Sequence, residues 1–580
     1  MVQRKSQAPQ STPRRSALFQ PKILELFRSP YPISDFRGDL TAGFTVALLA
    51  LPLALALGIA SVPAGVTTPV SAPFLGLTTA ILAGFLISLL GGSRFQIGGP
   101  TAAFIPLILL ILEEHGFQGL MISTMMAGVF LILMGLTRMG TLIKYIPWPV
   151  TSGFTTGIAV SIMVSQLPEL LGFHGTVPPP RDFFEKIPWL WEHLPSIHFM
   201  DFGLGLFTLA VVLLWPIWGW KHIPGTIVAI TAGTLLAWLV QLSGETHLAT
   251  IGSRFGADCL NLTSIHFQLP SVDLGLLKEL LGPALAITLL GAIESLLSAV
   301  VADGLTDQRH DSNTELIAQG WANLVTPIFC GLPATGAVVR TSANITHGAR
   351  SPLAGILHAV ILLVLVLLAA PILIHVPLAA MAAVLIMVAF RMGDWAEIAR
   401  AHHLPKSDFL VLIATLVLTV VFDLVVAVEI GMVLAAALFI KKVSDTTEVS
   451  LVTERDELES PEQLAHGKRI PHGVIVYRIF GPFLFGAAEK MEAALERLNE
   501  LPRVLILRLH LVTAMDATAL NTLQIVVDRL RKRNVAVILS GLHHQPLAIL
   551  QKSGMIGEIG RENICAHFDE ALARAEKLLG

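Results

Sequence analysis

Two short stretches rich in glycine and proline interrupt apolar segments, one in each half of the chain. Residues 98–104 read GGPTAAF, and residues 331–337 read GLPATGA. Each stretch follows the first long apolar segment of its half at a similar distance. A helix that is broken inside a bilayer exposes backbone N–H groups and the positive end of its dipole, which attract an anion. The paired breaks therefore predict a transporter built from inverted repeats, with an anion held at the bilayer midplane.

The backbone around the two breaks supplies the expected anion ligands. Small side chains allow a ligand to approach the amide groups closely, although small residues also serve tight helix packing. Glycine and proline are poor packing residues in a spanning helix, so they favour the binding interpretation. The residues expected to contact the anion are Gly99, Pro100, Thr101, Ala102 and Ala103 at the first break, and Gly336, Ala337, Val338, Val339 and Arg340 at the second.

Glu294 is the only charged residue in the apolar run 284–301. An ionised carboxylate at the centre of a spanning helix costs about 2.5–3.5 kcal/mol on insertion scales, so such residues usually face a cavity and carry function. A buried carboxyl group also holds a proton readily, which predicts that Glu294 couples transport to protons. Two alternatives stay open: a neutral side chain bonded between helices, or a sodium site completed by Ser298 one turn later.

Arg340 follows Gly336 by one helical turn. A guanidinium beside two helix starts would add a fixed positive field to the anion site. The alternative is an interfacial arginine that extends to lipid headgroups. An ion pair between Glu294 and Arg340 is expected when no substrate is bound.

Composition places most of the chain in lipid. Of its 580 residues, 53% are hydrophobic and 14% are charged, whereas a soluble domain has about 25% charged residues. The net charge of −3 argues against a nucleic-acid partner. Three distant cysteines show no metal-binding spacing, and there is no nucleophile–base constellation or Walker motif. We therefore expect no metal, no cofactor and no enzymatic activity.

The pattern of apolar runs and cations predicts the domain organisation. Hydropathy supports eleven to fourteen crossings, and fourteen place the cationic loops on one side, as the positive-inside rule requires. No signal peptide is expected in the N-terminal segment, and its excess of positive charge predicts a cytoplasmic location. Expected divisions are a segment 1–38, a transmembrane domain 39–442, a linker 443–472 and a small α/β domain 473–580. In that domain we expect strands at 474–479, 504–509 and 535–539, and helices at 487–498, 517–531 and 545–553.

Several motifs resemble the sulfate permease (SulP) family. They are DLTAG at 39–43, ALPLA at 50–54, GGSR at 91–94, GPTAA at 99–103 and LGAIESLL at 290–297. The C-terminal part resembles a STAS domain. The resemblance implies an all-α membrane fold of fourteen segments in a seven-plus-seven inverted repeat, with a core domain that slides against a gate domain. It also implies a homodimer in the bacterial inner membrane.

Within the family, the chain is most similar to the C4-dicarboxylate carriers. The motifs that carry this likeness are SRF at 93–95, LILMGL at 131–136 and YIP at 145–147. The resemblance places Ala50, Leu53 and Leu57 on the pocket-lining face of the first helix, where an apolar surface suits a substrate with a carbon backbone. It predicts elevator-like, proton-coupled uptake of C4-dicarboxylates. Sulfate and then bicarbonate are the alternative substrates, with sodium as the alternative coupling ion. An uncoupled anion channel and a membrane sensor are alternatives of another class.

Thr518 occupies the place of the serine that is phosphorylated in the STAS-containing anti-sigma-factor antagonists that this domain resembles. A phosphate there would lie at a helix start, where negative charge is favourable. The favoured alternative is structural, with Asp516 or Thr518 as the residue that caps the helix.

Overall fold

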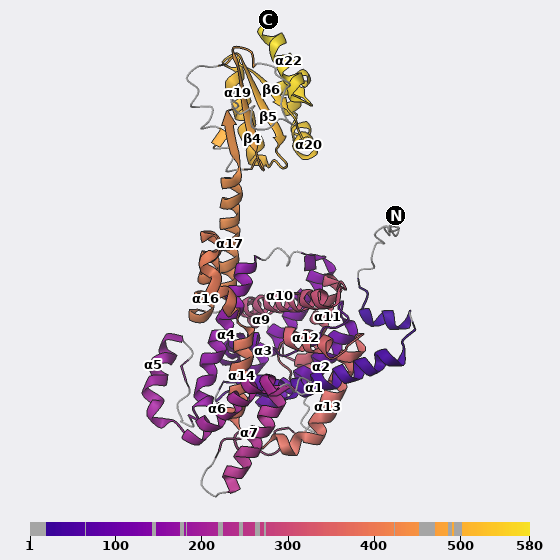
Figure 1. Ribbon diagram of the computed structural model, residues 1–580, viewed down its shortest axis with the longest axis vertical. Coiled ribbons are helices and arrows are strands. Elements are labelled where there is room, and N and C mark those ends of the chain that lie inside the picture. Colours follow the sequence, from indigo (N-terminus) through magenta and orange to yellow (C-terminus); the bar gives the residue numbers. More distant parts are fainter. Residues whose placement is uncertain are drawn as a thin grey trace. The chain divides into compact units, whose positions relative to one another are not determined.

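The computed structural model describes residues 19–28, 30–63, 65–141, 147–173, 179–180, 183–218, 224–242, 248–260, 267–271, 274–422, 424–451, 470–484, 490–491 and 502–580. The chain divides into two compact units, Met1–Met432 and Val433–Gly580. The first is helical and the second contains a β-sheet (Figure 1).

The first unit is built from helices of very unequal length. In chain order they are η1 (Lys22–Phe27), α1 (Ile33–Ala60), α2 (Ala72–Leu90), η2 (Ala102–Phe104), α3 (Ile105–Leu136), α4 (Trp148–Leu170), α5 (Phe183–His193), η4 (Leu194–Ser196), α6 (Phe199–Leu214), η5 (Trp215–Trp218), α7 (Gly225–Leu242), α8 (Ile251–Phe255), α9 (Leu274–Glu279), α10 (Leu281–Thr306), α11 (Ser312–Val325), η7 (Thr326–Phe329), α12 (Val338–Thr346), α13 (Leu353–Leu373), α14 (Leu378–Met392), α15 (Trp395–Arg400), η8 (Ala401–His403) and α16 (Lys406–Val421). Helix α17 (Leu424–Thr446) carries the chain into the second unit.

Seven of the described helices are long and apolar enough to cross a bilayer alone, and nine if each of two bent pairs counts as one span. The membrane-domain prediction is confirmed as a helical fold, while the number of fourteen crossings stays a prediction. Part of the difference between fourteen predicted crossings and the seven to nine candidate spans lies in α3, which counts as one span. At Gly116 a φ of 63° breaks α3 into two segments. These segments correspond to two apolar runs of the sequence, 98–112 and 117–137. Another part lies in α12, which has nine residues and is too short to span.

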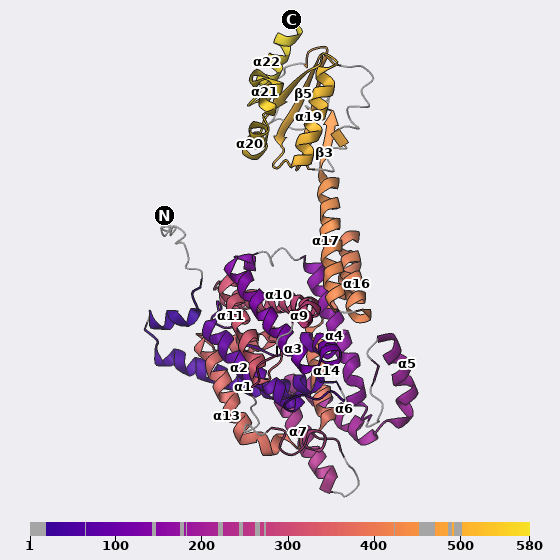
Figure 2. The ribbon, with the colours of Figure 1, turned by 180° about the vertical axis from the view of Figure 1, so that it is seen from behind.

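The helices of the first unit pack into two groups. Helices α1, α2, α3 and α10–α13 contact one another, and α4, α6, α7, α14 and α16 contact one another. In both views α11 and α13 lie toward one side of the unit and α4, α6 and α16 toward the other, while α3, α7 and α14 lie near the middle, where α1 contacts α7 and α14 (Figures 1 and 2). Close approach within the first group depends on glycine: a Cβ on Gly76 of α2 would lie 2.0 Å from the carbonyl oxygen of Ala54 in α1. This contact fixes the first two helices against each other.

The second unit is a five-stranded sheet of order β3-β4-β5-β6-β7, in which β3 is antiparallel to β4 and the other pairs are parallel. The strands are β3 (Glu448–Leu451), β4 (Val474–Phe480), β5 (Val504–Leu511), β6 (Ala536–Ser540) and β7 (Ile564–Cys565), and the helices are α19 (Ala517–Arg531), α20 (His544–Lys552), α21 (Met555–Ile559), η11 (Arg561–Asn563) and α22 (Phe568–Leu579). One sheet face packs with α19 and the other with α22.

This sheet confirms the predicted α/β domain, including three predicted strands and the helices at 517–531 and 545–553 to within one or two residues. The predicted helix 487–498 lies almost wholly outside the described residues, and so does most of the predicted linker 443–472.

Asp39 ties the start of α1 to the turn that precedes α13. Its carboxylate is fully buried and accepts hydrogen bonds from the backbone N–H of Arg350 (2.5 Å) and Ser351 (3.0 Å). The hydroxyl groups of Tyr31 and Ser351 donate to it as well, each at 2.5 Å. The burial of this acid is offset by four donors from two segments, and these hydrogen bonds connect the start of α1 to the turn before α13.

Replacing Asp39 by alanine is expected to lower the free energy of unfolding by roughly 3 kcal/mol, because two buried N–H groups lose their acceptor. The measurement is the thermal unfolding midpoint of the purified chain in detergent. Asp35→Ala is the matched control, since the Asp35 side chain has no hydrogen-bond partner in the described parts of the chain. Equal midpoints for the two variants would contradict the role assigned to Asp39.

Candidate anion site at two paired helix breaks

The two breaks lie side by side as a short antiparallel ribbon. Strand β1 (Gly98–Gly99) pairs with β2 (Thr335–Gly336), with Gly98 opposite Gly336 and Gly99 opposite Thr335. The backbone N–H of Ala337 also donates to the carbonyl of Ile97 at 2.8 Å. The ribbon therefore brings together the starts of two helical segments that are more than 200 residues apart in the sequence.

Polar side chains from neighbouring helices hold the second break in place. The Ser295 hydroxyl of α10 accepts from the Gly336 N–H at 3.1 Å, and Thr335 donates to the Gly291 carbonyl at 3.0 Å. Asn323 of α11 pairs with both backbone groups of Ala334, at 2.8 and 2.9 Å. Non-helical backbone at membrane depth requires such partners, and they leave the helix starts themselves available.

Neither helix start at the ribbon has a side-chain cap. Segment η2 begins after Thr101 and α12 begins after Ala337, and in both cases no side chain bonds the first amides. Thr101 and Val338 are partly exposed, and Val339 is 50% exposed, whereas Ala102 and Ala103 are buried. Uncapped helix starts carry unsatisfied N–H groups and partial positive charge.

Arg340 lies beneath the ribbon and not at a lipid interface. Its side chain is 3% exposed, and its Nη2 donates to the carbonyl of Pro100 at the first break. Its Nη1 has no hydrogen-bond partner within the described chain, and no acid of that part forms an ion pair with it. A Cβ on Gly99 would lie 2.5 Å from Nη1. The glycine therefore makes room for the guanidinium, which contributes a positive charge close to both breaks.

Glu294 is bonded to the first break. Its Oε2 accepts a hydrogen bond from the Thr101 hydroxyl at 3.0 Å, and the residue is partly exposed. The expected ion pair with Arg340 is absent among the described contacts: Arg340 donates to the Pro100 carbonyl, while Glu294 accepts from the Thr101 hydroxyl. Glu294 and Arg340 thus contact the same break through different residues, Thr101 and Pro100.

Ser298 does not contact Glu294 in the described structure. Its hydroxyl is buried and donates to the Thr341 hydroxyl at 3.1 Å, and Thr341 in turn accepts from the Ile97 N–H at 3.1 Å. Ser298 thus joins α10 to α12 and to the first break. No group of three or more His, Cys, Asp or Glu side chains suited to a metal lies in the described ranges.

The apolar face of α1 adjoins the first break. Ala50, Leu53 and Leu57 are buried in the same apolar cluster as Ala102 and Ala103. The role assigned to these three side chains as pocket lining stays a prediction.

Several residues that organise the site were missed by sequence reasoning. Besides Ser295, Asn323 and Thr341, buried Glu315 accepts hydrogen bonds from the N–H groups of Gly92 (2.9 Å) and Ser93 (3.2 Å). These bonds hold the loop that leads from α2 into the first break. The sequence does carry a signal for them. Glu315, Gln319 and Asn323 stand at successive helical turns of an otherwise apolar segment, which is typical of buried polar residues that bond neighbouring backbone.

In the second unit, Thr518 is exposed near the start of α19, and the N-cap is Asp516. The Asp516 carboxylate accepts from the Ala519 N–H at 2.8 Å. The capping role therefore belongs to Asp516, and modification of Thr518 stays a prediction.

Comparison with known proteins gives consistent matches over almost the whole chain. Residues 36–415 match the model of the Sulfate permease family, and residues 467–571 match the STAS domain. The chain is 38% identical over 541 residues to "Putative sulfate transporter YvdB" of Bacillus subtilis, covering 93% of this chain and 98% of the relative. It is 30% identical over 558 residues to Bicarbonate transporter BicA of Picosynechococcus, covering 93% and 95%.

Among solved structures, the fold is similar to murine Solute Carrier 26 family member A9, an anion transporter in the inward-facing state. The TM-score is 0.82 at 16% identity, with 98% of this chain and 97% of the other covered. At this identity the likeness concerns the fold alone.

Gly99→Ala is expected to reduce anion uptake by roughly tenfold, because the new Cβ displaces the Arg340 guanidinium and costs a charge-assisted hydrogen bond. Uptake is measured with the purified chain in liposomes, after size-exclusion chromatography has shown an intact fold. Gly304→Ala in α10 is the control, since its Cβ would meet open space. Wild-type uptake by Gly99→Ala would contradict the placement of Arg340.

Asp516→Ala is expected to destabilise the first turn of α19 by about 1 kcal/mol, which corresponds to roughly fivefold faster amide exchange. Thr518→Ala should leave the exchange unchanged, because Asp516 supplies the cap. Hydrogen exchange followed by mass spectrometry on the full chain measures both variants. Faster exchange in Thr518→Ala would contradict the assignment of the cap to Asp516.

Proposed function

Because the chain belongs to the sulfate permease family of anion transporters, we propose that it carries small anions by secondary active transport across the bacterial inner membrane. The preferred reaction is proton-coupled uptake of C4-dicarboxylates such as succinate, fumarate or aspartate. The N-terminal segment and the STAS domain are cytoplasmic in this proposal, and the protein works as a homodimer.

The observation that carries the proposal is the antiparallel pairing of β1 with β2. It places two uncapped helix starts and the buried cation Arg340 around one point. Oriented amides and a fixed positive charge bind an anion without reorganisation. In this proposal the amides of residues 101–103 and 337–339 contact the substrate, and Arg340 supplies long-range attraction.

Glu294 supplies a physical basis for coupling. Its carboxylate lies one hydrogen bond away from Thr101 at the first helix start. If it is ionised, it repels an anion at the same helix start by on the order of 3 kcal/mol, for unit charges about 6 Å apart at an effective dielectric constant of about 20. Protonation removes this repulsion, so that proton and anion bind together and move together.

The two packed groups of helices support an elevator-like cycle. Both breaks and their supporting side chains belong to the group of α1–α3 and α10–α13. This group can move as a core that carries the site past the other helices, which act as a gate. The proposed transmembrane domain 39–442 comprises fourteen segments in two inverted repeats.

The apolar surface of Ala50, Leu53 and Leu57 favours a substrate with a carbon backbone. Sulfate is the second candidate, because a relative at 38% identity bears the name of a sulfate transporter. Bicarbonate is the third, through the 30% identical bicarbonate transporter. Sodium coupling is the alternative to proton coupling and would use Ser298 together with Glu294. An uncoupled channel or a membrane sensor would fail to concentrate any anion.

Labelled succinate is expected to accumulate in liposomes when the outside is acid, and to be displaced by fumarate more strongly than by sulfate. The experiment uses the purified full chain with imposed pH and sodium gradients. Uptake should fall as the pH rises, since the singly charged anion and the protonated Glu294 both become rarer. Uptake that rises with pH, or that requires sodium, would overturn proton coupling.

Glu294→Gln is expected to abolish accumulation driven by a pH gradient while preserving anion binding. Its affinity at pH 8 should exceed that of the wild type at pH 8, because the amide carries no negative charge that repels the anion. Isothermal calorimetry and uptake assays separate the two effects. Glu279→Gln, in the exposed end of α9, is the control and should behave as the wild type. Binding by Glu294→Gln that depends on pH as steeply as binding by the wild type would contradict the assignment.

A further inference from the structure

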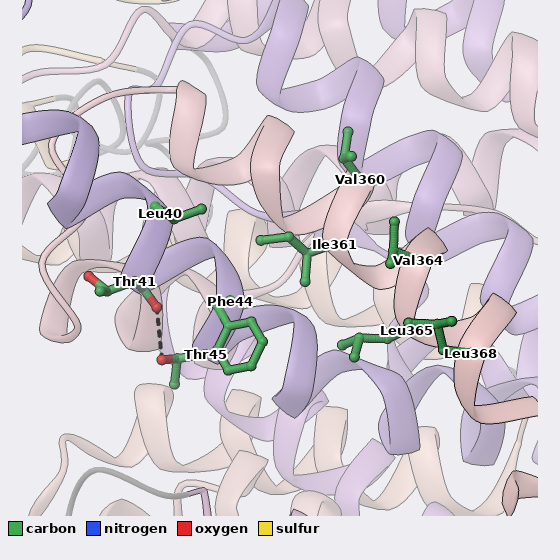
Figure 3. A pocket seen from close by; sticks show the side chains of 9 residues that line it. All are labelled: Leu40, Thr41, Phe44, Thr45, Val360, Ile361, Val364, Leu365 and Leu368. Carbon is green, nitrogen blue, oxygen red and sulfur yellow. Dashed lines mark hydrogen bonds between the residues drawn. The ribbon is translucent and has the colours of Figure 1, made fainter.

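A groove with an apolar lining runs along the outer face of the first unit, between α1 and α13 (Figure 3). Its volume is about 650 Å³, and its walls include Leu40, Phe44, Val360, Ile361, Val364 and Leu368. Phe44 from α1 and Leu365 from α13 point into the same space (Figure 3). Phe44 and Leu368 are 48% and 73% exposed, so the groove opens to the surroundings of the helices.

The two hydroxyl groups in the groove are engaged within α1. Thr41 donates to the Gly38 carbonyl at 2.9 Å, and Thr45 donates to the Thr41 carbonyl at 2.9 Å. Neither hydroxyl hydrogen is directed to a ligand. The groove therefore fits a hydrocarbon chain and offers nothing to the anion that the helix breaks attract.

Two arginines stand at one end of this groove. Arg37 is exposed and lies one turn before Thr41, on the same face of α1. Arg350 is exposed, and its Cγ lies 3.6 Å from the position that a Cβ on Gly38 would take, so its stem lies against α1 at the residue that follows Arg37. Neither guanidinium forms an ion pair with a residue that the structure describes.

The nearby acids leave these two charges available. Asp39 is buried and satisfied by the bonds to Tyr31, Arg350 N–H and Ser351. Asp35 lies two residues before Arg37 on a different face of the helix, where the two side chains do not meet. The end of the groove is thus cationic, while its length is apolar.

We propose that the groove and the two arginines form a binding site for an anionic phospholipid. One acyl chain lies between α1 and α13, and the phosphate lies between Arg37 and Arg350. Guanidinium groups recognise phosphate through paired N–H donors, and long cationic side chains at helix ends reach the headgroup level. Because lipid tails are as apolar as the groove itself, the chain fixes the position while the headgroup provides the selectivity.

The site occupies helices of the group that carries both breaks, so a bound lipid would accompany that group. The site is independent of the proposed substrate and coupling ion. A test that measures lipid retention therefore fails or succeeds separately from any transport assay.

Native mass spectrometry of the full chain in detergent measures retention of phosphatidylglycerol and of phosphatidylcholine with identical acyl chains. We expect one phosphatidylglycerol per chain, bound roughly tenfold more tightly than phosphatidylcholine. The double variant Arg37→Gln/Arg350→Gln should lose this preference. Arg391→Gln, which removes an exposed cation at the end of α14, should retain it.

Val364→Trp fills the groove and should weaken the binding of both lipids, whereas Leu367→Trp on the exposed surface of α13 should not. Unchanged phosphatidylglycerol retention in either the double arginine variant or Val364→Trp would overturn the proposal. So would equal competition by inorganic phosphate or glycerol phosphate, since a site for a free anion would need no acyl groove.

Discussion

The structure depends on the pairing of two interrupted segments inside the membrane domain. Helix α12 is too short to span a bilayer alone, η2 leads directly into α3, and each follows a strand of only two residues. The ribbon of β1 and β2 satisfies part of this backbone, while Ser295 bonds the Gly336 N–H and Asn323 bonds both backbone groups of Ala334. Because unsatisfied backbone is costly in hydrocarbon, these bonds make the arrangement possible and determine which amides remain for a ligand.

The charges around the ribbon are kept separate, and this separation is the second constraint. Arg340 bonds the Pro100 carbonyl and Glu294 bonds the Thr101 hydroxyl, so the two charges lie at consecutive residues of one break without neutralising each other. A direct ion pair would cancel the positive field and would compete with any substrate anion. Separate partners are what the proposed function requires, since the cation must attract an anion while the acid binds and releases a proton.

Sequence reasoning located the breaks, the isolated acid and the STAS elements because each has a local signature. Glycine and proline interrupt a hydropathic run, Glu294 stands alone among apolar residues, and the α19 helix 517–531 follows from periodicity. It failed where the answer depends on which helices meet. Thr101 and Glu294 are 193 residues apart, and Ser298 contacts Thr341 because α10 lies against α12. Such partners are set by packing, which no local pattern encodes.

The same ribbon geometry is compatible with several anions, and this bears on how substrates differ among relatives. Backbone amides and a helix dipole recognise negative charge with little regard for shape. In the proposed function, discrimination therefore falls to side chains near the ribbon, for which Leu53, Leu57 and Val339 are the predicted candidates. Relatives at 38% and 30% identity carry the names of transporters for two different anions. Under the proposed function, a shared backbone site with a variable border would account for that range, because a change of border would leave the ribbon and its supporting bonds intact.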